Sequence, residues 1–250
     1  MSEPVLLVEQ SGRVRRLTFN RPKKLNAFDE ALRSAFFDAL DDAVADDSTH
    51  VIVLAGAGRA FCSGFDMSAG SGDRSGVLDA PADMIANKAT VDTWLRLWSL
   101  PKPLVAQVHG YCLGMANDIL ACCDLVYCGR SARIGMPEAR DMALPPTLGF
   151  WPAKVGLNRT KELLWTGRLL DGEDAVRFGL ANEVYDDEEL QARVDEIAAH
   201  ISEVKRPLLA VTKQAANAWF ETMGLRDAAL RGAEYHALYH QASSWGEAAE

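Results

Sequence analysis

Residues 104–128, LVAQVHGYCLGMANDILACCDLVYC, hold the pattern that most directly predicts the fold of this chain. The largely apolar run at 104–108 is typical of a short buried strand, and a second apolar run follows Asp124 at 125–128. A glycine-containing turn and a short helical pattern lie between the two runs. Strand, turn, helix and strand in this order indicate an α/β fold.

The same strand-and-turn pattern occurs earlier, in residues 51–67, VIVLAGAGRAFCSGFDM. A helix that starts after such a turn presents backbone N–H groups without partners and a partial positive charge. Two such helix starts brought together would offer two N–H donors to one oxygen, which is an oxyanion hole. Two ordinary strand–turn–helix connections would give the same pattern, so the residues alone leave both interpretations open.

The flanking segments continue this arrangement and become helical toward the C-terminus. A hairpin is predicted around Ser11 and Gly12, and a helix follows that Asp29 could cap. The apolar face of that helix is expected to contain Leu32, Phe36, Ala39, Leu40 and Val44. Residues 68–83 are predicted to form a loop, and long helices are predicted near 188–205, 207–222 and 224–241. No linker marks the change of pattern near 150–160, so these helices pack either on the same body or on another subunit.

Composition excludes several classes of function. The 250 residues are 48% apolar and 24% charged, and a net charge of −9 argues against a nucleic-acid partner. No apolar run has membrane-spanning length, and the start MSEPVLLVEQ is too short and too acidic for a signal peptide. Five cysteines without CxxC spacing indicate a reduced, cytoplasmic protein. His236 and His240 lie one helical turn apart but lack a third ligand, so we expect a helix surface and no metal site.

Two acidic residues, Asp118 and Glu138, stand in places where a carboxylate is unusual. Asp118 leads into an apolar stretch, and Glu138 follows a glycine and a proline in a turn-like setting. Two carboxylates facing each other in a dry site do not ionise together easily, and this supplies an acid and a base near neutral pH. The alternative is structural, with Asp118 as a helix cap and Glu138 as an exposed first-turn residue.

Several stretches in the same order resemble the crotonase (enoyl-CoA hydratase/isomerase) family. They are LTFNRPKKLNAFDEAL at 17–32, VIVLAGAGRAFCSGFDM at 51–67, KPLVAQVHGYCLGMANDILACCDLVYCGRSARIGMPEA at 102–139, TKELLWTGRLLDGEDAVRFGLANEVYDDEEL at 160–190 and RPLLAVTKQA at 206–215. The resemblance covers about residues 5–240 and implies repeated ββα units stacked into a spiral. It divides the chain into a core at 1–190 and a C-terminal helical region at 191–250, which the family uses for trimerisation. A homotrimer, or a hexamer made of two trimers, is therefore expected.

The resemblance also implies a substrate and a set of site residues. The substrate would be an acyl-CoA thioester, so that CoA is part of the substrate and no separate cofactor is expected. The family's two oxyanion donors fall on the backbone amides of Phe65 and Met115, and its two hydratase carboxylates fall on Asp118 and Glu138. The CoA-binding positions fall on Lys24, Arg21, Ala27, Asp66 and Met67. Lys24 and Arg21 belong to a basic cluster at residues 13–24 that would suit the CoA phosphates.

Three departures from the family pattern bear on the activity. Met115 and Ala116 replace glycines at the second donor, and Asp118 replaces a glutamate and is shorter by one methylene. LPPTLGFWPAKVG at 144–156 and SSWGEAAE at 243–250 replace the usual glycine-rich stretch and the usual basic ending. An enoyl-CoA hydratase acting on a 2-trans-enoyl-CoA is the leading interpretation. The alternatives are a double-bond isomerase that uses Glu138 alone, and a catalytically weak acyl-CoA-binding oligomer.

Overall fold

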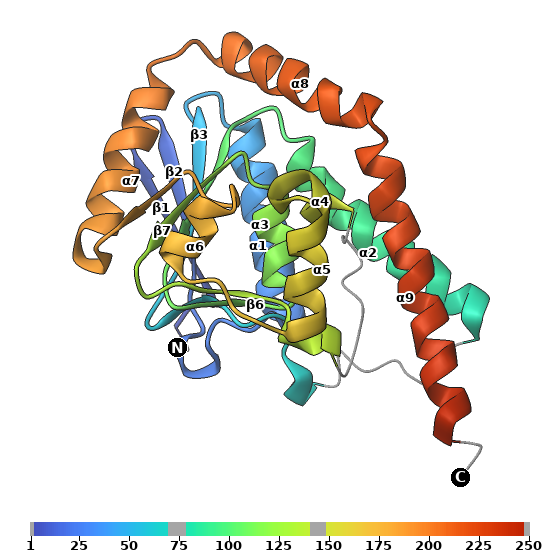
Figure 1. Cartoon of the computed structure of the whole chain (residues 1–250). Helices are drawn as coiled ribbons and strands as arrows, with labels where there is room; N and C mark the ends of the chain where they lie inside the picture. The colour runs from blue at the N-terminus through green and yellow to red at the C-terminus, as the bar shows by residue number, and fades with distance from the viewer. Residues whose placement is uncertain (1–2, 70–78, 141–148, 248–250) are drawn as a thin grey trace.

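A computed structural model describes residues 3–69, 79–140 and 149–247, and it shows two sheets surrounded by helices (Figure 1). The larger sheet has the strand order β1-β2-β3-β5-β7-β9. Its strands are β1 Leu6–Ser11, β2 Val14–Phe19, β3 Val51–Gly56, β5 Leu104–Val108, β7 Leu125–Gly129 and β9 Glu183–Tyr185. The first two strands pair antiparallel around the predicted hairpin, and every later neighbour is parallel.

A smaller sheet contains β4 Ala60–Cys62, β6 Tyr111–Leu113 and β8 Arg133–Gly135, all parallel. Each of these short strands comes directly after a strand of the larger sheet, so β3–β4, β5–β6 and β7–β8 are successive turns of one winding. Helix α2, Ala80–Trp98, follows the first pair, and helix α3, Ala116–Cys122, follows the second. The expected spiral of ββα units is confirmed.

Helix α1, Glu30–Ala45, begins where the sequence predicted, because the Asp29 side chain accepts the Leu32 N–H at 2.9 Å. Its buried face differs from the prediction at one position: Ala43 is buried, whereas Val44 is only half-buried. The other members of the predicted face are buried, and they pack beside a cluster of edge-to-face aromatic rings. This cluster contains Phe19, Phe28, Phe36, Phe61 and Trp94.

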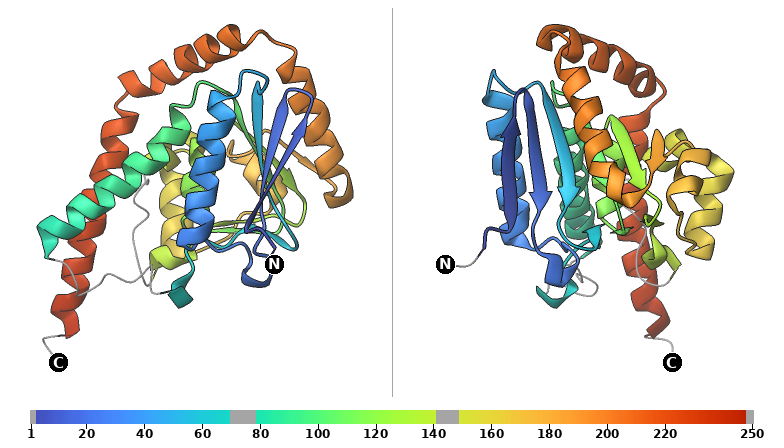
Figure 2. Two further views of the ribbon diagram at one scale, coloured as in Figure 1. Left: turned by 180° about the vertical axis from the view of Figure 1, so that it is seen from behind. Right: turned by 90° about the vertical axis from the view of Figure 1, so that its left-hand side faces the viewer.

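Alternate residues of β3 face opposite layers of the protein. Ile52 and Leu54 belong to the main core with α1, whereas Val51 and Val53 pack with Leu190 and other residues of α7, Asp187–Ser202. The larger sheet therefore lies between α1 and α7, as the side view in Figure 2 shows. The boundary expected between residues 190 and 191 falls inside α7. All five cysteines are buried and unpaired, as predicted.

The part after residue 149 is less purely helical than predicted. Short helices α4 Phe150–Val155, α5 Leu157–Thr166 and α6 Gly172–Arg177 precede β9, which extends the larger sheet. The 3₁₀ helices among the described residues are η1 Pro22–Lys24, η2 Met67–Ala69 and η3 Pro137–Arg140. The loop expected at 68–83 ends earlier, since α2 begins at Ala80 with Asp79 as its cap. Residues 70–78 of that loop lie outside the described residues.

Helices α8, Arg206–Thr222, and α9, Leu225–Glu247, complete the chain; α8 crosses from α7 toward α9, and α9 runs beside α2 (Figure 1). The expected helix surface at His236 and His240 is wrong, because both side chains lie mostly within the protein. His236 is 9% exposed, and His240 Nδ1 lies 2.8 Å from Asp83 Oδ2 of α2. Within the described ranges, no group of three metal-ligating side chains is found, and no helix is long and apolar enough to cross a membrane.

Candidate active site

Two glycine turns from different layers of the spiral meet at Gly64 and Gly114. Both glycines have left-handed backbone angles, φ +97° at Gly64 and φ +56° at Gly114, which residues with a side chain rarely adopt. A methyl group on Gly64 would lie 3.0 Å from the Leu113 carbonyl oxygen and 3.5 Å from the Met115 nitrogen. The backbone before Phe65 and the backbone before Met115 are therefore in contact.

The Phe65 amide is directed by a short parallel pairing with Phe28. Phe28 N donates to Gly64 O at 2.8 Å, and Asp66 N donates to Phe28 O at 2.9 Å. In a parallel pair, the residue between two such bonds directs its own N–H to the opposite side. Phe65 lies in an extended segment that pairs with Phe28, and the next element is the 3₁₀ helix η2 at Met67–Ala69, so the helix predicted directly after Gly64 does not begin there.

The Met115 amide lies at the N-terminal cap of α3. Met115 has ordinary helical angles, φ −54° and ψ −26°, because Gly114 takes the left-handed conformation in its place. Methionine is therefore accommodated here without backbone strain. Within the described part of the chain, neither the Met115 N–H nor the Phe65 N–H donates to another group of the protein. Two main-chain N–H groups without an acceptor among the described residues therefore lie on the two turns that meet.

Asn117 fixes the second turn to the strand that leads to Glu138. Its amide donates to Cys112 O and Gly114 O, both at 3.2 Å, and to Gly135 O at 2.7 Å. The side chain is fully buried, so these bonds are shielded from water. No sequence motif indicates this role, which depends on a contact between β6 and β8.

Glu138 brings its carboxyl group to the place where the two turns meet. A methyl group on Gly114 would lie 3.3 Å from Glu138 Oε1 and 3.8 Å from the Gly64 Cα. The side chain is half-buried, and this burial raises the pKa of Glu138 from 4.5 to about 7. The exposed alternative is therefore wrong for Glu138. Its carboxyl can be protonated or ionised near neutral pH, as a proton-transferring group requires.

Asp118 lies in the first turn of α3 and is 2% exposed. It is not the cap of this helix, since Met115 holds that position and accepts the Asp118 N–H at 2.9 Å. Its charge contributes to the raised pKa of the buried Cys122 thiol, after the larger effects of burial and of Cys123. The structure thus places a buried carboxyl group three residues beyond the second amide donor.

The five expected CoA-binding positions gather around the segment that carries Phe65, but they differ in environment. Lys24 and Met67 are exposed, and Lys24 Nζ lies 3.0 Å from Ser68 Oγ. The others are buried or nearly so: Arg21, Ala27 and Asp66 form one internal network of hydrogen bonds and ion pairs. Ser68 and Arg21 lower the pKa of Asp66 to about 2, so this carboxylate is ionised at neutral pH.

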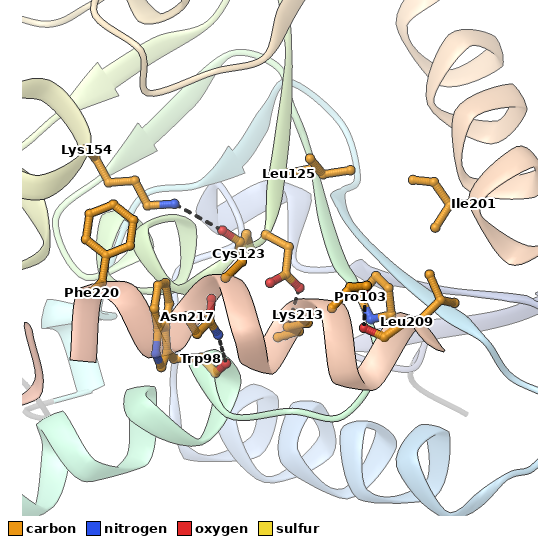
Figure 3. A pocket seen from close by; sticks show the side chains of 13 residues that line it. Trp98, Pro103, Cys123, Leu125, Lys154, Ile201, Leu209, Lys213, Asn217 and Phe220 are labelled. Atoms are coloured by element: carbon orange, nitrogen blue, oxygen red, sulfur yellow. Dashed lines mark hydrogen bonds and ion pairs between the residues drawn. The ribbon is translucent and has the colours of Figure 1, made fainter. Parts of the chain in front are cut away.

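A separate cavity of about 430 Å³ lies beneath α8 and contains none of the predicted site residues (Figure 3). Its walls include Trp98, Lys154, Asn217 and Phe220. Lys213 of α8 forms an ion pair with Asp124 Oδ2 at 2.7 Å at the edge of this cavity. The cavity therefore belongs to the attachment of α8 and not to the site at Glu138.

Comparisons with known proteins find similar sequences and similar folds. The family model for Enoyl-CoA hydratase/isomerase matches residues 9–247. The chain is 32% identical over 219 residues to the "Probable enoyl-CoA hydratase" of Rhizobium meliloti (strain 1021). This match covers 87% of this chain and 82% of the relative. The chain is 31% identical over 220 residues to the 1,2-epoxyphenylacetyl-CoA isomerase of Escherichia coli (strain K12), covering 87% and 83%. The crystal structure of an enoyl-CoA hydratase from Mycobacterium smegmatis matches with a TM-score of 0.85 and 30% identity, covering 94% of this chain and 84% of that one.

Proposed function

Because the chain belongs to the enoyl-CoA hydratase/isomerase family, we propose that it adds water to a 2-trans-enoyl-CoA. One observation supports the proposal most directly: the Glu138 carboxyl lies against Gly114, where the turns that carry Phe65 and Met115 meet. Such a site can bind a thioester oxygen and move a proton at a neighbouring carbon. The names of both relatives support a CoA-linked substrate, since one is a probable enoyl-CoA hydratase and the other a 1,2-epoxyphenylacetyl-CoA isomerase.

The proposed mechanism uses the two amides for charge and the carboxyl groups for protons. The thioester oxygen accepts both N–H bonds, which strengthen as an enolate forms when water oxygen bonds to the β-carbon. Loss of one such donor typically costs about a hundredfold to a thousandfold in rate. Glu138 delivers a proton to the α-carbon, and Asp118 helps to hold the attacking water. The proton that the attacking water loses passes to the Glu138 carboxylate and restores its protonated form. The net reaction therefore adds H to the α-carbon and OH to the β-carbon.

An isomerase is the second candidate, because Glu138 is the carboxyl that the geometry brings against the two turns. In that reaction, Glu138 takes a proton from the α-carbon of a 3-enoyl-CoA and returns it to the γ-carbon. The amides hold the dienolate oxygen between the two steps, and Asp118 has no essential part. The shorter reach of Asp118 relative to glutamate favours this alternative, since a displacement of about 1 Å can cost a hundredfold in rate.

Two substrates separate the candidates. With crotonyl-CoA, a hydratase removes the conjugated thioester absorbance; with a 3-enoyl-CoA, an isomerase creates it. We expect crotonyl-CoA to be consumed, and activity on the 3-enoyl substrate alone would exclude the hydratase. Binding of both thioesters without turnover would instead identify an acyl-CoA-binding protein. A homotrimer or hexamer and a cytoplasmic location remain predictions.

A further inference from the structure

The Arg21 guanidinium is held by three groups near the proposed site. Nη2 lies 2.8 Å from Asp29 Oδ2 and 2.9 Å from Asp66 Oδ2, and Nη1 donates to the Ala27 carbonyl oxygen. The Arg21 side chain is 16% exposed and that of Asp66 is 7% exposed. Charge-assisted bonds of this kind, in a partly dry setting, are stronger and more directional than those at the surface.

These contacts close a short backbone ladder between residues 25–28 and 63–66. At one end of this ladder, Ser63 N donates to Leu25 O at 3.0 Å. Toward the other end, Phe28 N donates to Gly64 O, and Asp66 N donates to Phe28 O. Arg21 joins the segments at that second end, because Ala27 belongs to one and Asp66 to the other. Phe65 lies immediately before Asp66, so the orientation of its N–H depends on how firmly this end is held.

The same contacts make Arg21 a poor ligand for a phosphate. The Arg21 guanidinium already faces the carboxylates of Asp29 and Asp66. If it turned toward a phosphate, the nearly buried Asp66 carboxylate would lose its ion pair with Arg21, and the loss of such a pair is unfavourable for a buried charge. Lys24 has the opposite character, since it is exposed and, among the described residues, bonds to the neutral Ser68 hydroxyl. The two cations of this cluster therefore suit different tasks.

We propose that Arg21 is a positioning residue that aligns the Phe65 amide with the Met115 amide, and that it does not contact the CoA phosphates. This role rests on the proposed function and replaces the CoA-binding role expected for Arg21. Its direct consequence is that loss of Arg21 weakens polarisation of the bound thioester carbonyl without weakening recognition of CoA.

The test is a difference spectrum of a bound conjugated thioester. Cinnamoyl-CoA is added to the Glu138→Gln variant, which prevents turnover, and to the same protein carrying either Arg21→Gln or Lys24→Gln. Polarisation of the carbonyl by two N–H donors moves the absorbance of such a thioester to longer wavelength. We expect Arg21→Gln to remove at least half of this shift and Lys24→Gln to leave it unchanged.

Affinities for CoA and for CoA lacking its 3′-phosphate complete the comparison. We expect Arg21→Gln to change both affinities by no more than about twofold. Lys24→Gln, in contrast, should weaken the binding of CoA severalfold and reduce the difference in affinity between CoA and CoA lacking its 3′-phosphate. An Arg21→Gln protein that keeps the full spectral shift but loses about tenfold in CoA affinity would overturn the proposal. No shift in the parent protein would overturn the proposed function itself, and the positioning role with it.

Two further variants keep the proposal falsifiable if Arg21→Gln does not fold. Asp66→Asn removes a charge from the same contact, and Arg21→Lys keeps the charge but loses the planar fork. With Glu138 intact, we expect both to lower kcat by about tenfold to a hundredfold, because the donor is displaced, while KM stays within about twofold. A raised KM with unchanged kcat in both variants would contradict the role.

Discussion

At the scale of single residues, the Glu138 carboxyl determines how activity should depend on pH. Burial raises its pKa to about 7, so the protonated form dominates below that pH and the ionised form above it. Hydration requires Glu138 to donate a proton, so kcat/KM for crotonyl-CoA should fall as pH rises through about 7. Isomerisation requires it to accept one, so kcat/KM for a 3-enoyl-CoA should rise over the same range. A profile that is flat between about pH 6 and 8 for the substrate that is turned over would contradict either role.

Replacement of Glu138 by glutamine keeps the size of the side chain and removes its ability to transfer a proton. We expect turnover of the active substrate to fall by at least about a hundredfold, the lower end for a general acid–base group. Ligand affinity should persist, because the amides of Phe65 and Met115 are untouched. Glu188→Gln, on the exposed surface of α7, is the matched control and should keep full activity. Equal turnover in the two variants would remove Glu138 from the mechanism.

Residue roles were predictable from the sequence only to a limited extent. The resemblance placed Phe65, Met115 and Glu138 at positions that the structure brings together, although spacing alone left a structural alternative open. Arg21 shows why the rest was not predictable: one of its three partners, Asp66, lies 45 positions away in the sequence, so the contact depends on the fold. Asn117 likewise acts through carbonyl groups of two strands.

At the scale of elements, prediction succeeded where the hydrophobic pattern was long or continuous. The strands at 51–56 and 104–108 and the capped helix after Asp29 have strong local signals, and they formed with nearly the predicted limits. β9 was missed because its three residues, EVY, are half-exposed in a charged stretch and depend on pairing with β7. The missing helix after Gly64 has a comparable cause, since Phe65 pairs with Phe28 as an extended segment instead.

The contact between the two glycine turns gives a prediction at this scale. In Gly64→Ala, a side chain at φ +97° meets the Leu113 carbonyl oxygen at 3.0 Å, so the turns must separate. We expect a stability loss of about 1–3 kcal/mol and a fall in kcat, measured by denaturant unfolding and steady-state kinetics. Gly12→Ala is the control, because Gly12 has φ +55° in the first hairpin with no atom within 4 Å of the added methyl. The Gly12→Ala protein should lose stability and keep its kcat. Equal kcat values for Gly64→Ala and Gly12→Ala would contradict an active site that depends on the contact between the two turns.

At the scale of the whole molecule, α8 and the residues beside it present an apolar stripe to solvent. Its members are Val204, Leu208, Val211, Trp219 and Met223, each between 37% and 70% exposed. Their spacing of three, four or eight residues places them on one face of a helix. An exposed stripe of this length is typical of a surface that another protein covers, which agrees with the trimer expected from the family resemblance.

Light scattering after size exclusion tests this expectation. We expect a mass of three or six times the 27.3 kDa chain, and a shift toward the monomer in Trp219→Lys, because a charge at a buried apolar contact is unfavourable. Trp165→Lys is the control, since Trp165 is 74% exposed on α5, outside the stripe. A monomeric parent protein, or equal masses for the two variants, would exclude α8 as the contact between copies.

The most direct measurement is a crystal structure of Glu138→Gln with a 2-enoyl-CoA bound. The account predicts a thioester oxygen at about 2.7–3.1 Å from both the Phe65 and the Met115 nitrogen, with the side-chain amide introduced at position 138 beside the α-carbon. A carbonyl group bound elsewhere, or the two N–H groups directed away from each other in the complex, would contradict it.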